Sequence, residues 1–172
     1  MPNTNTIARC GSLPGAAQGA SSSNEFQFVD SLAAQANVRV GSTYLKRRQF
    51  LIKAGGRSVG EPDAVTLTLK LYLGKSATIG SNVLVFSSGA KTITGLTGSW
   101  ELEAIAVINE TSKAIEGIGY GAVNNIAVAQ AALSATTTAD PNAEIAFTVT
   151  GQFSTSDVAN AAICDYFEVE GL

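Results

Sequence analysis

Histidine is absent from the 172 residues of the chain. This absence excludes Ser-His-Asp and Cys-His catalysis, His-ligated zinc or iron, and imidazole acid–base chemistry. Charged residues are also scarce, at 15% of the chain, where a typical soluble domain has about 25%. A surface so poor in charge suggests that other protein covers part of it. The net charge of −3 argues against a general nucleic-acid-binding role.

Cysteine is rare as well. Cys10 and Cys164 cannot form a four-ligand structural zinc site or a disulfide framework. We therefore expect free thiols in a reducing compartment, with one long-range bridge between them as the alternative. No apolar run approaches the roughly 20 residues of a membrane-spanning helix, and residues 1–24 lack the apolar core of a signal peptide. The sequence thus predicts a soluble product of the cytosol, with no cofactor and no membrane partner.

Residues 1–24 are rich in glycine, serine, alanine and asparagine, and their only sizeable apolar residues are Ile7 and Leu13. Such a segment cannot bury enough apolar area to offset the entropy lost on ordering. A mobile tail is the simplest interpretation. The more specific prediction is an extended N-terminal arm that a partner orders, with Ile7, Arg9 and Leu13 as its anchor points.

From residue 25 onward the apolar pattern has a period of two, which is typical of strands. The clearest segment is Val65–Leu73, where apolar residues occupy every odd position. Similar runs recur at 26–29, 44–53, 83–86, 91–94, 100–108, 115–123, 126–133, 144–153 and 161–169. Turn-forming clusters, one of them at residues 55–56, separate these runs. The pattern predicts an all-β domain over 25–172, an antiparallel sandwich or barrel, with short helices over 30–36 and 127–135 as the alternative there.

Periodic apolar positions on at least three strands predict one core between two sheets. The residues expected in that core are Leu67, Leu69, Leu71, Trp100, Leu102, Phe147 and Phe167.

Gly117, Gly119 and Ala122 fit the spacing of a relaxed dinucleotide-binding fingerprint, G-x-G-x-x-A, and Gly121 adds a third glycine to the segment. That fingerprint works only inside a βαβ unit, whereas these glycines lie among strand patterns, so nucleotide binding is not predicted. Residues two apart share one face of a strand. Three missing side chains on that face indicate the close approach of another sheet, chain or loop.

Charge is distributed unevenly along the chain. Positions 39–57 hold six of the eleven basic residues, among them Arg39, Lys46, Arg47 and Arg48, whereas residues 143–172 carry only acidic charges. A solvated strand face is the simple explanation. The more specific one is electrostatic pairing between subunits, or with an acidic partner, which sets register more than affinity.

Glu101 and Glu103 share one strand face, as the two carboxyl groups of a glycosidase could. Nothing in the sequence indicates a raised pKa at one of them alone, so we predict no enzyme. A separate possibility is a sugar-stacking platform, and its candidate aromatic residues are Tyr44, Tyr72, Trp100, Tyr120 and Tyr166. Most aromatic residues fall on periodic core positions, which favours the core.

Three stretches, Tyr44–Arg57 (YLKRRQFLIKAGGR), Val65–Gly74 (VTLTLKLYLG) and Trp100–Ala104 (WELEA), occur in this order. Together they resemble small virion structural proteins of tailed bacteriophages, which decorate or cement the head or build tail appendages. The resemblance implies a jelly-roll-like β-sandwich, no catalysis and a homo-oligomer, with a trimer on the capsid lattice as the best-known arrangement. The motif positions are strand-core positions, so no functional residue is transferred.

The leading hypothesis is a head decoration (cement) protein, assembled in the host cytoplasm, that binds the major capsid protein on the outer surface of the virion head. The alternative is a receptor- or carbohydrate-binding module of a tail fibre or baseplate. Low charge, the glycine face and the complementary charged segments together predict a homotrimer. The predicted partner-binding residues are Ile7, Arg9, Leu13, Arg39, Lys46, Arg47, Arg48, Gly117, Gly119 and Gly121.

Overall fold

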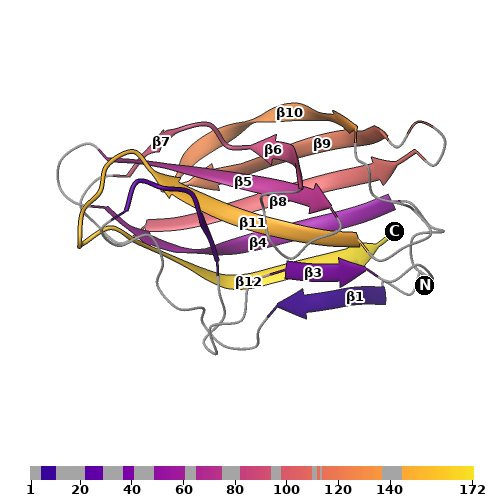
Figure 1. Cartoon of the computed structure of the whole chain (residues 1–172), viewed down its shortest axis with the longest axis horizontal. Helices are drawn as coiled ribbons and strands as arrows, with labels where there is room; N and C mark the ends of the chain where they lie inside the picture. Colours follow the sequence, from indigo (N-terminus) through magenta and orange to yellow (C-terminus); the bar gives the residue numbers. More distant parts are fainter. Residues whose placement is uncertain are drawn as a thin grey trace.

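A computed structural model describes residues 5–10, 22–28, 37–40, 49–60, 65–74, 82–93, 98–109, 112, 114–136 and 145–172. Over these residues the chain forms twelve strands, arranged in two antiparallel sheets (Figure 1). The predicted all-β antiparallel sandwich is confirmed. The jelly-roll arrangement stays a prediction. None of the described segments is a helix long and apolar enough to cross a membrane.

Sheet A has the strand order β1-β12-β4-β8-β9-β10. Its strands are β1 (Asn5–Cys10), β12 (Ala161–Gly171), β4 (Gln49–Val59), β8 (Gly98–Ile108), β9 (Ala114–Val123) and β10 (Ile126–Thr136). Sheet B has the order β2-β11-β5-β6, and β3 and β7 pair with β11 and β5. Its strands are β2 (Phe26–Gln27), β11 (Ile145–Phe153), β5 (Thr66–Gly74), β6 (Val83–Ser87), β3 (Asn37–Val40) and β7 (Lys91–Thr92).

The core lies between the two sheets. All seven residues predicted for it are buried there in one cluster, which confirms the assignment of strand faces. Aromatic pairs join the sheets: Phe50 of β4 meets Phe147 of β11 at 5.6 Å between ring centroids. Near one end, Phe28 stacks on Trp100 of β8 at 5.0 Å. The leucine face of β5 is therefore the inner face of sheet B.

The alanine-rich segment that was a possible helix is a strand, β10. Asn124 and Asn125 connect it to β9, and both have positive φ angles, 49° and 62°. Two consecutive left-handed residues form the turn type that favours a two-residue hairpin. The hairpin pairs β10 with β9 from Ile126 opposite Val123 to Thr136 opposite Ala114. This strand pairing overrides the helix preference of the alanines. The other possible helix, 30–36, lies outside the described residues.

The turn predicted at Gly55-Gly56 is wrong, because β4 runs through both residues. A side chain at Gly55 would lie 2.5 Å from the Tyr166 hydroxyl oxygen, and one at Gly56 would collide with the Ile163 carbonyl. These glycines therefore allow β12 and its side chains to approach β4 closely, rather than reverse the chain.

Of the three glycines in β9, only Gly119 faces the opposing sheet as predicted, whereas a Cβ at Gly117 or Gly121 would meet the backbone carbonyl of Ile105 or Glu101 on the neighbouring strand β8. Gly119 is buried, and a Cβ there would lie 2.6 Å from the ring of Phe86 on β6. The side chain that Gly119 lacks leaves room for the opposing sheet.

The range of the predicted arm contains β1, which pairs antiparallel with β12, with Asn5 opposite Gly171 and Cys10 opposite Phe167. The boundary between an arm at 1–24 and a sandwich at 25–172 stays a prediction.

Candidate functional site

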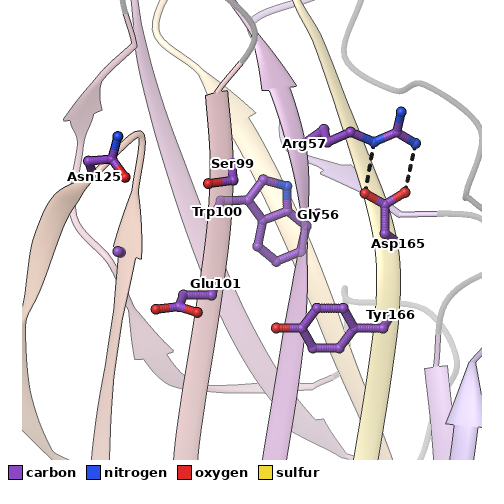
Figure 2. Close-up of a pocket in the computed structure, with 9 residues that line it drawn as sticks. Gly56, Arg57, Ser99, Trp100, Glu101, Asn125, Asp165 and Tyr166 are labelled. Atoms are coloured by element: carbon purple, nitrogen blue, oxygen red, sulfur yellow. Dashed lines mark hydrogen bonds and ion pairs between the residues drawn. The ribbon is translucent and has the colours of Figure 1, made fainter.

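The outer face of sheet A, turned away from the core, contains a groove of about 520 Å³ (Figure 2). Strands β4, β8 and β12 and the turn between β9 and β10 provide its walls. The polar and aromatic residues that line it are Arg57, Ser99, Trp100, Glu101, Asn125, Asp165 and Tyr166. Its volume lies within the range of about 300–1,000 Å³ that small-ligand sites occupy.

A β-bulge in β12 shapes one wall of the groove. Cys164 pairs with Gly56 and Tyr166 pairs with Gly55, so Asp165 is an extra residue in β12. A bulge of this kind interrupts strand alternation and redirects side chains. As a result, the consecutive side chains of Asp165 and Tyr166 both lie on the outer face (Figure 2).

The Tyr166 ring crosses β4 directly over Gly55, where a Cβ would lie 2.6 Å from its Cε1 and Cζ atoms. Its hydroxyl points toward Glu101 on β8 (Figure 2). The residue remains 41% exposed. Partial burial, and then the nearby Glu101 carboxylate, raise the pKa of Tyr166 above its usual value. Tyr166 is therefore a neutral, amphipathic surface at ordinary pH, supported from below by bare backbone.

Arg57 and Asp165 form a bidentate ion pair across β4 and β12. Arg57 Nε donates to Asp165 Oδ2 at 2.9 Å, and Arg57 Nη2 donates to Oδ1 at 2.8 Å. This pairing raises the pKa of Arg57. Both side chains are solvent-accessible, so the pair contributes little to stability. Its effect is to hold the guanidinium group in one orientation at the groove wall.

Glu101 is exposed in the groove and forms no hydrogen bond or ion pair with another described residue. Beyond it, a smaller depression of about 60 Å³ adjoins the groove and shares Glu101 and Tyr166 with it. There the Tyr120 hydroxyl donates to Oε1 of Glu103. This hydrogen bond raises the pKa of Tyr120, and Lys53 lines the same depression.

The aromatic residues considered for a sugar platform separate into different places. Trp100 is buried, and its indole Nε1 donates to the Ile163 carbonyl at 3.1 Å. Tyr72 is half-buried on sheet B, and Tyr44 lies outside the described residues. Of the four that the structure describes, Tyr120 and Tyr166 are exposed, and both lie on the outer face of sheet A.

Tyr72 belongs to a polar cluster on the outer face of sheet B. The carboxylate of Glu25 accepts from Lys70 Nζ at 2.6 Å and from Thr150 Oγ1 at 2.5 Å. Burial alone would raise the pKa of Glu25, but hydrogen bonds from Lys70, Thr150 and Tyr72 outweigh it, so the pKa lies below its usual value. Burial and Glu25 raise the pKa of Tyr72 to about 12. The cluster ties residues 22–28 to β5 and β11, which is a structural role.

The predicted partner-binding residues are dispersed. Positions 7 and 9 lie in β1, Arg39 lies in β3, and the three glycines lie in β9. Leu13 and residues 46–48 lie outside the described residues. Their role at a partner surface stays a prediction.

The basic and acidic segments meet within the chain itself. Strands β4 and β12 are neighbours in sheet A, Lys53 lies opposite Glu168, and Arg57 pairs with Asp165. Pairing between subunits is therefore not needed to explain this part of the charge pattern.

Within the described ranges, no group of three acidic or cysteine residues is placed to hold a metal ion. Cys164 is buried, and its Sγ atom donates to the Tyr166 carbonyl at 3.2 Å; the predicted thiol state of Cys10 and Cys164 stays a prediction. Sequence reasoning missed the groove, because neither the bulge at Asp165 nor the position of Tyr166 over Gly55 has a recognisable sequence signal.

Fold and groove together define an antiparallel β-sandwich with a polar, tyrosine-sided groove on its outer face. No protein-family model matches the chain, and no curated protein aligns with it significantly. Among solved structures, the chain is similar to the CBM2 module of the evolved Dit of Lactobacillus casei BL23 phage J-1. That similarity has a TM-score of 0.35 and 9% identity, and it covers 92% of this chain and 75% of that one. A likeness this remote transfers neither a residue role nor an activity.

Proposed function

We propose that the protein is a non-enzymatic structural component of a tailed-phage virion, and that it decorates the outer surface of the head. The observation that carries the proposal is the resemblance of three ordered stretches to such proteins. In the structure these stretches fall largely on β4, β5 and β8. Its partners are then the major capsid protein and further copies of itself, in a homotrimer.

Surface properties support this proposal. Only 15% of the residues are charged, and a decoration protein relies on many weak contacts repeated by symmetry rather than on one strong pocket. The edge strand β10 is eleven residues long and contains no charged residue and no proline. Exposed edge strands of soluble proteins usually carry charged residues or prolines, which prevent pairing with another chain. An uncharged edge is suited to contact with another protein.

The test is the number of copies in purified virions, measured by quantitative mass spectrometry against the major capsid protein. A head decoration protein is present in fixed proportion to the capsid protein. A few copies for each particle would reject head decoration. Light scattering on the isolated protein tests the trimer, since a monomer at micromolar concentration would contradict it.

A receptor- or carbohydrate-binding module of a tail fibre or baseplate is the second candidate. The observation that favours it is the groove on sheet A, where the exposed Tyr166 and the exposed carboxylate of Glu101 lie side by side. The same copy count tests it, because a tail module is present in few copies.

A further inference from the structure

The groove has two kinds of surface that a saccharide requires. A pyranose ring has one apolar face of C–H groups and a rim of hydroxyls that both donate and accept hydrogen bonds. Tyr166 offers a flat ring backed by the bare Gly55 backbone, so a ligand can contact only its outward side. Aromatic side chains of this kind combine apolar area with a polar tip.

Hydrogen-bonding groups line the rest of the groove, Glu101 next to the Tyr166 ring and Asn125 on the opposite side (Figure 2). Glu101 contributes a carboxylate acceptor without a protein partner among the described residues. Asn125 contributes an amide, which both donates and accepts, from the left-handed turn at the opposite rim. Hydrogen bonds to an ionised acceptor are about twice as strong as those between neutral groups. A ligand hydroxyl near Glu101 would therefore be oriented as well as bound.

Charge in the groove selects against an anionic ligand. Asp165 already accepts two hydrogen bonds from Arg57, so that guanidinium group is largely neutralised. Glu101 adds a negative charge to the groove, where no described residue forms an ion pair with it, and Lys53 lies in the adjoining depression. A phosphate or a uronic acid would meet this carboxylate directly, and like charges at close range repel.

We propose that the groove on the outer face of sheet A binds a neutral saccharide, with its apolar face on Tyr166 and its hydroxyls on Glu101 and Asn125. This inference rests on the carbohydrate-binding candidate above. The adjoining depression, with Tyr120 on its far side, extends the site along the strands. A ligand of more than one sugar unit would therefore bind more tightly than a monosaccharide.

The experiment uses the full chain and an array of neutral oligosaccharides of hexoses and N-acetylhexosamines, with polyglucuronate and hyaluronate as anionic probes. Affinity for the best neutral oligosaccharide is then measured by isothermal titration calorimetry. We expect Tyr166→Ala to weaken binding at least tenfold, because the stacking surface is lost. Tyr166→Phe keeps the ring and should stay within about threefold of the unchanged protein. Glu101→Ala should weaken binding severalfold.

Leu84→Ala is the matched control, since Leu84 is 43% exposed on the other sheet and its variant should bind normally. Thermal melts establish that each variant is folded before it is titrated. Saturation-transfer NMR adds a second measurement, in which neutral sugar protons should receive magnetisation from the unchanged protein and much less from Tyr166→Ala.

Three results would overturn the proposal in different ways. If a neutral oligosaccharide binds and both Tyr166→Ala and Glu101→Ala bind it equally well, the carbohydrate-binding candidate stands and the groove assignment is wrong. If the anionic probes bind more tightly, the ligand class is wrong. If no saccharide binds, the carbohydrate-binding candidate fails together with the groove assignment, and the copy count still decides head decoration independently.

Discussion

Replacing Leu69 by alanine tests the sandwich core most directly. Leu69 lies in the middle of β5 and is completely buried. The substitution removes three carbon atoms, which at about 0.8 kcal/mol each corresponds to about 2.4 kcal/mol of lost transfer free energy. A cavity that stays open adds to this loss, and buried leucine-to-alanine changes cost about 2–5 kcal/mol in total.

The surroundings of Leu69 favour the upper part of that range. Its cross-strand partner on β11 is Gly151, which has no side chain that can shift into the space. The Phe26 ring already fills the position that a Cβ of Gly151 would occupy. Ser88 bonds to both the amide and the carbonyl of Leu69, through its side-chain oxygen and its backbone nitrogen, so the β5 backbone is held in place. The cavity therefore cannot collapse easily.

Urea denaturation followed by circular dichroism measures the change in the free energy of unfolding. A chain of this size loses roughly 2–4 °C in Tm for each kcal/mol, so Leu69→Ala should melt roughly 5–20 °C lower. Leu84→Ala, at an exposed position, should change stability by less than about 1 kcal/mol. A loss below about 1 kcal/mol for Leu69→Ala would refute the assignment of this face to the core.

Three further predictions follow from particular contacts. Gly119→Ala forces a Cβ against the Phe86 ring and should cost about 1–3 kcal/mol in urea denaturation; adding Phe86→Leu should restore part of the loss, and no recovery would contradict the close contact. The pKa of Glu25 is lower in the folded protein than its ordinary 4.5, so its contribution to stability is present above that pH and is lost as the pH falls through the lower folded value. Urea midpoints between pH 3 and pH 7 should therefore fall more steeply for the unchanged protein than for Glu25→Gln, and parallel curves would contradict the assignment. Arg57→Ala breaks an exposed ion pair with Asp165 and should change the free energy of unfolding by about 0–1 kcal/mol; a change above 2 kcal/mol in the same assay would show that the pair has a larger structural role.

The sequence alone determined the fold class, the core and most of the strands, because each of these depends on local periodicity; β1 and β3 were not predicted. In β5, alternation over Val65–Leu73 is sufficient to assign one face to the core, since side chains alternate strictly along a strand. The same reasoning placed Phe147 and Phe167 in that core before their strand partners were known. The absence of histidine likewise excluded whole classes of catalytic chemistry without any structure.

Tertiary structure decided the points where a residue serves a distant neighbour. Gly55 and Gly56 have the local signature of a turn, and only the position of β12 shows that they clear space for Tyr166 and the Ile163 carbonyl. Alanines in β10 favour a helix locally, but pairing with β9 holds them in a strand. The groove depends on a bulge that brings together β4, β8 and β12, which are far apart in the sequence. Such contacts are set by the register between strands, and register depends on packing across the sheet rather than on any one segment.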